Sequence, residues 1–113
     1  MSVINKESAE HYKWGNDCDG WHLVKSENLS VIQERVPPNC AENYHYHRKA
    51  EQFFFVLSGT ATMELNNQVF VIPEQSGIHV PAGAKHRLSN QHPMELIFTV
   101  TSTPPSHCDR VEL

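Results

Sequence analysis

Residues 44–59, with the sequence YHYHRKAEQFFFVLSG, hold the features around which we expect the chain to fold. The segment opens with two histidines, His45 and His47, separated by one residue. Side chains two residues apart leave the same face of a β-strand, so these two imidazoles can bind one ion. An apolar run follows at residues 53–57, and Ser58-Gly59 can turn the chain back. The stretch predicts strands that carry part of a metal site.

A divalent metal needs further protein ligands beyond two imidazoles. Glu51 and Gln52 follow the histidine pair and offer an oxygen ligand, but adjacent side chains leave opposite faces of a strand, so only one of them can join the site. The best candidate for a third imidazole is His86, in the second organised stretch, PAGAKHRLSN. Imidazole suits zinc, nickel and iron, and an amide oxygen also admits manganese.

Length and composition predict a single globular domain. The chain has 113 residues, 39% of them hydrophobic and 19% charged, which suffices for one core but not for two. The net charge of −4, with no basic cluster, argues against a nucleic-acid partner or an anionic membrane. The apolar runs are far shorter than a membrane span, and the N-terminus lacks an apolar signal segment. We therefore expect a cytoplasmic protein.

The cysteines agree with a reducing compartment. Cys18, Cys40 and Cys108 are odd in number, widely spaced and without a Cys-x-x-Cys pair. This spacing matches neither a disulfide framework nor a thiolate zinc site, so we expect free thiols.

The hydrophobic pattern predicts short strands and no helix. Residues 1–13 are polar and unpatterned, which suggests a flexible arm preceding a domain at residues 14–113. Trp14 and Trp21 are expected to cover one open end of the core. Nine strands are expected, at residues 21–25, 29–36, 44–47, 52–57, 60–65, 69–72, 78–80, 85–89 and 95–101. Asn66-Asn67 is a candidate two-residue hairpin turn. The pattern indicates an all-β barrel or sandwich.

Two groups of residues resemble the sequence motifs of the cupin superfamily. The first is His45-x-His47, four residues, Gln52, six residues and Gly59, and the second is Pro81-x-Gly83-x-x-His86-x-x-x-Asn90. The resemblance covers roughly residues 36–90 and implies a small jelly-roll barrel, also called a double-stranded β-helix. It further implies a metal inside the barrel, held by two histidines and a glutamate from the first motif and by one histidine from the second.

The chain departs from the family pattern at two positions. Asn39 stands where glycine is usual, and asparagine can itself adopt a left-handed conformation. Glutamine stands where glutamate is usual: counting four residues from His47 and six to Gly59 gives Gln52 from both directions, whereas Glu51 fits only a shorter first spacing and then overshoots to Gly59. Some cupins use glutamine here. The expected ligands are therefore His45, His47, Gln52 and His86.

The glutamine has a chemical consequence. Three neutral imidazoles and a carboxamide leave the ion with its full charge of about +2, which favours anionic or strongly polarised ligands. A metal with an open position acts as a Lewis acid on a carbonyl, carboxylate or enolate oxygen. Such a site suits isomerase, epimerase or lyase chemistry on a sugar or keto acid. No pair of carboxylates, Ser-His-Asp order or glycine-rich phosphate loop is evident in the sequence.

Two alternatives remain open. The protein could be a metal-dependent dioxygenase. It could also be a non-catalytic binding module, with a pocket walled by Phe54, Val56, Met63 and Leu88 or their neighbours. A charged general base near the open metal position would favour chemistry, and a purely apolar wall would favour binding.

The remaining polar residues are expected to be structural or exposed. His79 and His92 match no ligand position, and His11, His22 and His107 have weaker claims still. Tyr44, Arg48, Lys49 and Arg87 flank ligands and could touch an anionic substrate, although an outer position is expected for each. The resemblance also implies a homodimer, for which exposed edge strands near the N-terminus provide a physical motive.

Overall fold

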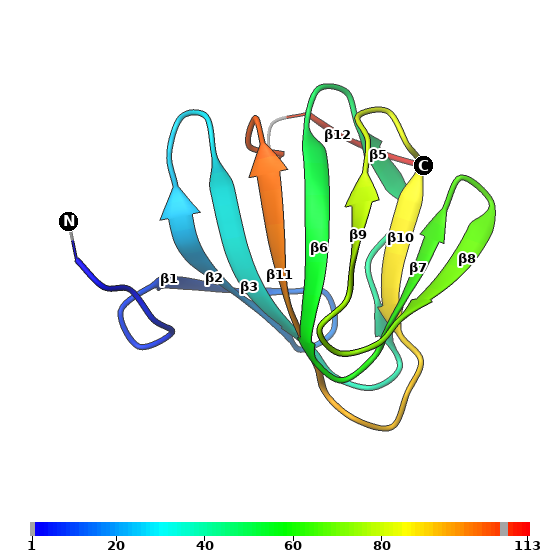
Figure 1. The fold of residues 1–113 in the computed structure, drawn as a ribbon, viewed down its shortest axis with the longest axis horizontal. Helices are drawn as coiled ribbons and strands as arrows, with labels where there is room; N and C mark the ends of the chain where they lie inside the picture. The colour runs from blue at the N-terminus through cyan, green and yellow to red at the C-terminus, as the bar shows by residue number, and fades with distance from the viewer. Residues whose placement is uncertain (1, 107–108) are drawn as a thin grey trace.

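The structure is a computed structural model that describes residues 2–106 and 109–113. Within these residues the chain forms β-strands in two sheets and contains no helix, and hence no helix capable of crossing a membrane. Figure 1 shows the sheets curving around a common interior, with the first strand extending to one side. This arrangement is the all-β jelly-roll architecture expected from the sequence.

The first sheet has six strands in the order β1-β2-β3-β11-β6-β9. Their bounds are β1 Glu10–Trp14, β2 Cys18–Lys25, β3 Ser30–Val36, β11 Leu96–Thr103, β6 Glu51–Ser58 and β9 Gly77–Val80. All neighbouring pairs are antiparallel. The pairing of β11 with β3 and β6 brings the N-terminal third, the centre and the C-terminal part of the chain into one layer.

The second sheet has the order β12-β5-β10-β7-β8, and β4 also pairs with β10. Its bounds are β12 Arg110–Glu112, β5 His45–His47, β10 His86–Asn90, β7 Ala61–Leu65, β8 Gln68–Ile72 and β4 Cys40–Ala41. The two motifs found in the sequence therefore meet, because β5 carries the first and β10, its neighbour, carries the second.

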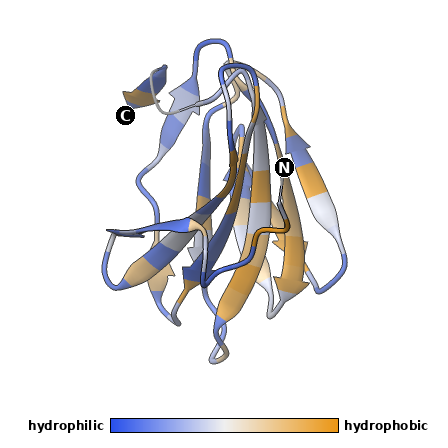
Figure 2. Ribbon diagram, turned by 90° about the vertical axis from the view of Figure 1, so that its left-hand side faces the viewer, coloured by the Kyte–Doolittle hydropathy of each residue, from blue (hydrophilic) through white to orange (hydrophobic). Residues whose placement is uncertain are grey.

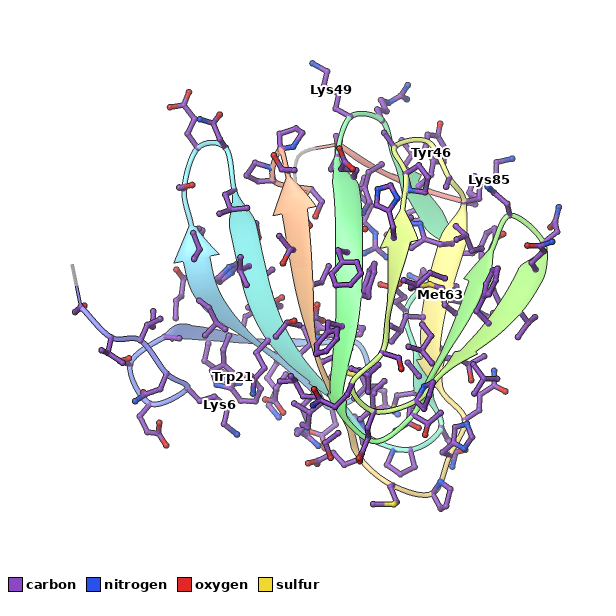
Figure 3. The ribbon with its side chains drawn as sticks, in the orientation of Figure 1. Lys6, Trp21, Tyr46, Lys49, Met63 and Lys85 are labelled. Atoms are coloured by element: carbon purple, nitrogen blue, oxygen red, sulfur yellow. The ribbon has the colours of Figure 1, made fainter. Side chains whose placement is uncertain are left out.

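The core lies between the two sheets and follows from strand alternation. On β6 the side chains of Gln52, Phe54 and Val56 are buried, whereas Glu51 and Phe53 on the opposite face are exposed. Figure 2 shows hydrophobic and hydrophilic segments interspersed along the strands. Met63 on β7, labelled in Figure 3, is completely buried in the interior. On β6, one face therefore contributes to the core and the other lies outside it.

Asparagine and glycine occupy the turns that need a left-handed backbone. Asn66 and Asn67 have φ angles of 48° and 69° and connect β7 to β8, as the hairpin prediction required. Asn39 has a φ of 65°, which confirms that asparagine takes the left-handed conformation at the position where cupins usually have glycine.

The strand prediction missed three strands, β1, β4 and β12. The expected boundary between residues 13 and 14 falls inside β1, whose five residues all pair with β2. The sequence of β1, EHYKW, lacks the apolar alternation of a half-buried strand, and backbone pairing with β2 compensates for this. β4 and β12 contain two and three residues, too few for a periodic pattern.

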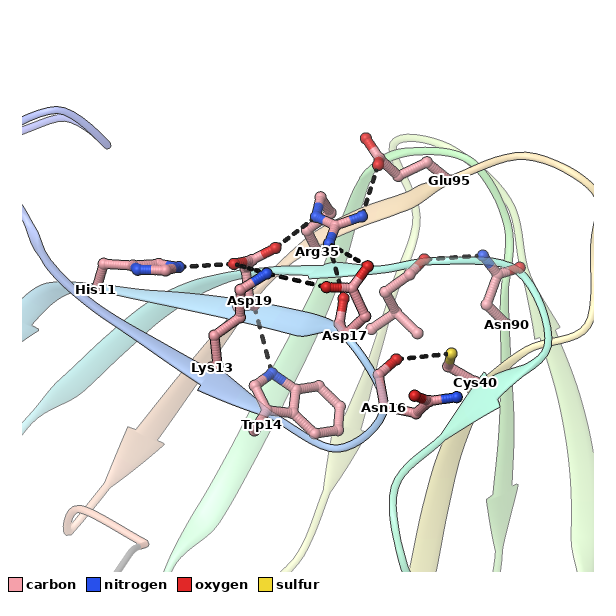
Figure 4. Close-up of polar contacts among 11 residues, drawn as sticks. His11, Lys13, Trp14, Asn16, Asp17, Asp19, Arg35, Cys40, Asn90 and Glu95 are labelled. Carbon is pink, nitrogen blue, oxygen red and sulfur yellow. Dashed lines mark hydrogen bonds and ion pairs between the residues drawn. The ribbon is translucent and has the colours of Figure 1, made fainter.

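An ion-pair network fixes β1 and β2 to β3 (Figure 4). The Arg35 guanidinium on β3 donates to Asp19 Oδ2 at 2.6 Å and to Glu95 Oε2 at 2.9 Å. The His11 ring on β1 lies 2.6 Å from Asp19 Oδ1. Burial raises the pKa of Asp19, but hydrogen bonds from His11, Arg35 and Lys13 outweigh it and hold this pKa well below its usual range. His11 thus has the structural role expected of it.

The two tryptophans differ in position. Trp14 packs against the core, as expected. Trp21 does not cover the open end. Its neighbour His22 lines the interior cavity, so the Trp21 side chain leaves the opposite face of β2. There it contacts the His11 ring and Lys6 Nζ, which lies 4.9 Å from the indole centroid. Figure 3 shows Lys6 and Trp21 together at the β1 side of the molecule. Cys18 and Cys40 are free, as expected, and both are buried; Cys108 and His107 lie outside the described residues.

Candidate metal centre

The three histidines of the two motifs converge inside the barrel. His45 and His47 leave the same face of β5, and His86 on β10 lies directly opposite His45 in the strand register. One ligand nitrogen from each ring lies within 4.8 Å of the other two. The ring centroids of His45 and His86 are 4.3 Å apart, and those of His45 and His47 are 5.0 Å apart. This spacing suits a single ion bound by all three rings.

Hydrogen bonds fix the tautomer and the orientation of each ring. Nδ1 of His45 lies 2.6 Å from the Asn43 carbonyl oxygen, and Nδ1 of His86 lies 2.9 Å from the Ala84 carbonyl oxygen. Nδ1 of His47 lies 3.0 Å from Asp109 Oδ1. Carbonyl and carboxylate oxygens only accept, so Nδ1 carries the proton in each ring and the Nε2 lone pair is left for a metal.

All three imidazoles are held in their neutral form. Burial is the main cause in each case: it lowers the pKa of His45 to about 3 and also lowers the pKa values of His47 and His86. The other nearby imidazoles and Arg110 lower the pKa of His45 further. Because metals bind neutral imidazole, no proton need be displaced from these rings at neutral pH.

Gln52 and Glu51 point in opposite directions. Gln52 is 7% exposed and its Nε2 donates to Ser102 Oγ at 3.0 Å and to Ser106 Oγ at 3.4 Å. Glu51 lies on the outer face, with Oε1 2.8 Å from the exposed ring of His79. The amide of Gln52 therefore belongs to the interior, whereas the Glu51 carboxylate belongs to the surface.

Two buried polar atoms of the proposed ligands have no hydrogen-bond partner among the described residues. They are Nε2 of His86 and Oε1 of Gln52. Leaving such atoms unpaired inside a protein costs roughly 1–3 kcal/mol each. Both atoms are acceptors here, because Nδ1 of His86 holds the ring proton and Nε2 of Gln52 holds the amide protons. A cation bound by both residues would satisfy these two acceptors, so the donor set fits a metal ion.

A cavity of about 510 Å³ opens beside the histidines. It is lined by side chains of both sheets, namely Tyr12, Trp14, His22, Lys25, Ser30, Ile32, Glu34, Glu42, His45, His47, Gln52, Phe54, Val100, Ser102, Ser106 and Arg110. His86 itself is 1% exposed. The cavity is large enough for a small organic molecule next to the candidate ligands.

The expected apolar wall is correct only in part. Phe54 lines the cavity, but Val56, Met63 and Leu88 are fully buried in the core. The cavity wall is polar as well as apolar because strands β1, β2 and β3 contribute polar residues to it. These residues belong to neither sequence motif, so the sequence analysis did not select them.

Two carboxylates line the cavity, Glu34 and Glu42, although no carboxylate pair was expected from the sequence. Burial raises the pKa of Glu34 to about 8, with the charge of Glu42 as a second cause. Burial also raises the pKa of Glu42 to about 7, against the hydrogen bond from the Leu88 amide. One signal could have revealed Glu34: it lies between Ile32 and Val36, at a position of β3 where an apolar residue fits the alternation.

The other polar residues occupy outer or loop positions. Arg87 pairs with Glu64 at 2.7 Å, and His92 donates its backbone amide to Asn90 Oδ1. Tyr44, Arg48 and Lys49 do not line the cavity, whereas Arg110, which the sequence interpretation did not select, does.

Comparison with known proteins gives a consistent picture. The family model described as "Cupin domain" matches residues 32–101. An uncharacterised protein of Methanocaldococcus jannaschii is 27% identical over 89 residues, which are 78% of this chain and 71% of that protein. The mannose-1-phosphate guanylyltransferase of Klebsiella pneumoniae is 28% identical over 95 residues, which are 81% of this chain but only 20% of that enzyme.

Among solved structures, a cupin-superfamily sugar phosphate isomerase from Silicibacter pomeroyi superposes with a TM-score of 0.79 at 18% identity. The superposition covers 92% of this chain and 76% of that protein. At this identity the likeness establishes the fold.

Proposed function

Because this chain belongs to the cupin family, we propose that it binds a divalent metal inside the barrel and uses it to act on a small oxygenated molecule. The proposed ligands are His45, His47, Gln52 and His86. One observation carries the proposal: the three neutral imidazoles bring one ligand nitrogen each within 4.8 Å of one another, and the buried amide oxygen of Gln52 has no hydrogen-bond partner among the described residues. Zinc, manganese, iron and nickel all suit this donor set.

The bound metal would supply Lewis-acid polarisation of a substrate oxygen. The protein side chains set the conditions for it. Hydrogen bonds to Asn43, Ala84 and Asp109 hold the imidazoles in place, and Ser102 and Ser106 hold the Gln52 amide. Since none of the four proposed ligands is anionic, the centre would keep its positive charge and favour a substrate with a carboxylate or a polarised carbonyl.

The proposed substrate is a sugar-like or keto-acid-like molecule. The cavity of about 510 Å³ admits a compound of this size, and its lining offers both hydrogen-bonding groups and the apolar side chains of Phe54 and Val100. Names of similar proteins support a sugar-related role: one is a sugar phosphate isomerase and another a mannose-1-phosphate guanylyltransferase. The second contains the matching region as only a fifth of its length.

An enzyme is favoured over a binding module by the composition of the cavity wall. A module that only holds a ligand needs no group that exchanges protons, yet Glu34 and Glu42 line the cavity with pKa values near neutrality. A dioxygenase is the second candidate. Three imidazoles and an amide would stabilise an oxidised iron less well than a set with a carboxylate, so we rank it below non-redox chemistry.

We also propose that the protein is a cytoplasmic homodimer. Cys18 and Cys40 are free thiols, as a reducing compartment requires. Strand β1 lies at an edge of its sheet and offers unpaired backbone groups to a second copy. Sedimentation should give twice the chain mass of 12.9 kDa, and a 12.9 kDa particle would refute the dimer.

Calorimetric titration of the metal-free protein with zinc chloride tests the proposal. Wild-type protein should bind about one ion per chain, and His86→Ala should weaken binding by at least 100-fold, since one of three imidazoles is lost. The control is His79→Ala, which removes an exposed histidine that faces Glu51 on the outer surface. Equal affinity of wild type and His86→Ala would exclude the proposed centre. Oxygen consumption by iron-loaded protein with enol-type substrates would instead support the dioxygenase.

A further inference from the structure

We propose that Glu34 and Glu42 form an acid–base pair that moves a proton between adjacent carbons of a hydroxy-carbonyl substrate. The inference rests on the proposed function and extends it by naming the reaction and the residues that would carry it. It assigns the protein to 1,2-proton-transfer chemistry, as in the interconversion of an aldose and a ketose.

Strand register places Glu34 on the inner face beneath Tyr12. Gly20 on β2 pairs with Tyr12 on β1 and with Glu34 on β3, so the three residues form one cross-strand row. A side chain at Gly20 would collide with the tyrosine ring, because a Cβ atom there would overlap Tyr12 Cζ. The missing side chain therefore lets the Tyr12 ring lie flat across β2 toward Glu34. Both Tyr12 and Glu34 line the cavity.

Glu42 reaches the cavity from the opposite sheet. Its Oε1 accepts a hydrogen bond from the Leu88 amide at 3.0 Å, and its own amide donates to the Leu88 carbonyl at 3.0 Å. Leu88 lies two residues after His86 on β10, so these contacts anchor Glu42 beside the strand that carries a proposed ligand. Glu34 from the first sheet and Glu42 from beside the second sheet thus line one cavity. His45 and His47 line the same cavity.

The surroundings keep both carboxyl groups able to hold or release a proton near neutral pH. The titratable groups that line the cavity with Glu34 are the Tyr12 phenol from β1, His22 and Lys25 from β2, Glu42, and Arg110 from β12. Of these, Glu42 and Arg110 act on the charge of Glu34, and Glu34 in turn acts on Tyr12. Glu42 faces Arg110 and Glu112. Burial and the charge of Glu42 raise the pKa of Glu34, whereas Arg110 lowers it. Burial thus raises the pKa values of both carboxyl groups toward neutrality, and the two groups titrate as one coupled pair.

The proposed step needs no oxidant, reductant or second substrate. The ionised carboxylate removes the C–H proton from the carbon that bears the hydroxyl group. The C–H electron pair becomes the new C=C bond, and the carbonyl π pair moves to the carbonyl oxygen, which takes a proton from the protonated carboxyl group. Return of a proton to the former carbonyl carbon, with loss of the hydroxyl proton from its neighbour, completes the shift. The pair regains its single proton.

Deuterium exchange into hydroxyacetone tests the inference, because this compound is a minimal hydroxy-carbonyl substrate. Zinc-loaded wild-type protein in D₂O should replace the CH₂ protons, as followed by proton NMR, faster than free zinc does. Glu34→Gln and Glu42→Gln keep the side-chain shape but cannot exchange a proton, so each should slow the reaction about 100-fold or more. The matched control, Glu64→Gln, removes a glutamate that pairs with Arg87 outside the cavity and should leave the rate unchanged.

Zinc affinity, measured on the same samples, separates this inference from the proposed function. Full zinc binding with no exchange by wild type would overturn the inference and leave the metal centre standing, whereas absence of zinc binding would refute both. Deuterium exchange at the wild-type rate in either Glu34→Gln or Glu42→Gln would also overturn the inference. A readout independent of activity is carbon NMR of labelled glutamate side chains in the metal-free protein. The titration midpoint of Glu34 should fall in Glu42→Gln, and an unchanged midpoint would contradict the coupling of the pair.

Discussion

Asp109 accepts a hydrogen bond from Nδ1 of His47 at 3.0 Å, although the two residues lie 62 positions apart in the sequence. Its second carboxylate oxygen accepts from the backbone amides of Lys49 and Ala50, at 2.8 and 2.9 Å. One side chain from the C-terminal segment thus fixes both the ring of a proposed ligand and the loop that follows it. Burial raises the pKa of Asp109, but these hydrogen bonds outweigh it and keep the group ionised.

Replacing this carboxylate should weaken metal binding. Asp109→Asn preserves the size of the side chain but removes its negative charge. That charge orients the His47 ring and makes Nε2 of His47 a stronger electron-pair donor to a metal. We expect a loss of about 10- to 100-fold in zinc affinity, measured by competition with a chelator. Glu64→Gln, outside the cavity, serves as the control. Unchanged affinity in Asp109→Asn would show that His47 needs no such support.

The choice between Gln52 and Glu51 as oxygen ligand can be tested by exchanging amide and carboxylate. Gln52→Glu would place a negative charge beside the metal, and the hydroxyls of Ser102 and Ser106 can rotate to donate to it. Zinc affinity should rise about tenfold or more, by attraction between the carboxylate and the ion.

Glu51→Gln is the matched change on the outer face, and it should leave zinc affinity unchanged because Glu51 faces His79. If Glu51→Gln instead weakens zinc binding and Gln52→Glu has no effect, the oxygen ligand is Glu51.

Two glycines with the same backbone conformation predict different costs for alanine. Gly59 and Gly83 have φ angles of 86° and 82°, so alanine is strained at both by about 1–2 kcal/mol. Only Gly59 is crowded: a Cβ atom there would lie 2.5 Å from the Glu95 carbonyl oxygen, whereas nothing lies within 4 Å at Gly83. Urea unfolding should therefore show a clearly larger loss of stability for Gly59→Ala. Equal losses of stability in Gly59→Ala and Gly83→Ala would mean that the backbone at Glu95 moves aside without an energetic cost.

The Asp19 network predicts a stability effect that depends on pH. The pKa of Asp19 is lower in the folded state than in the unfolded state, so its ionised form stabilises the fold above about pH 4. That contribution is lost as the pH falls through the folded-state pKa. Asp19→Asn should cost about 2 kcal/mol at pH 7, where Arg35 loses a charged partner, and progressively less below pH 4.

Denaturant unfolding of wild type and Asp19→Asn from pH 3 to pH 7 measures this difference. If the difference in free energy of unfolding between wild type and Asp19→Asn does not decrease in acid, the ionised carboxylate does not have the proposed role.

The sequence was most informative where a residue type had a specific geometric role. His45 and His47 had to share a face, Asn66-Asn67 had to turn the chain, and alternation had to separate Gln52 from Glu51; the structure places these side chains accordingly. His86 was selected through its place in the second motif. Its position opposite His45 comes from the pairing of β10 with β5, a long-range contact that no local pattern reveals.

Residues that act through long-range neighbours were missed for the same reason. Tyr12 lies in a polar strand, and its place in the cavity depends on the absence of a side chain at Gly20. Glu42 follows a two-residue strand, and Arg110 belongs to a three-residue strand. Elements this short carry no periodic signal, so only their pairing partners define them. Glu34 alone offered a local sign, as an acidic residue in an inward-facing position of β3.

Elemental analysis of protein purified without an affinity tag tests the central claim most directly, because it reports occupancy and identity of the metal together. We predict close to one equivalent of a transition metal per chain in wild-type protein, and less than a tenth of this in a His45→Ala/His47→Ala double variant that remains folded. Wild-type protein without transition metal that also binds none on titration, or a double variant that keeps a full equivalent, would contradict the account.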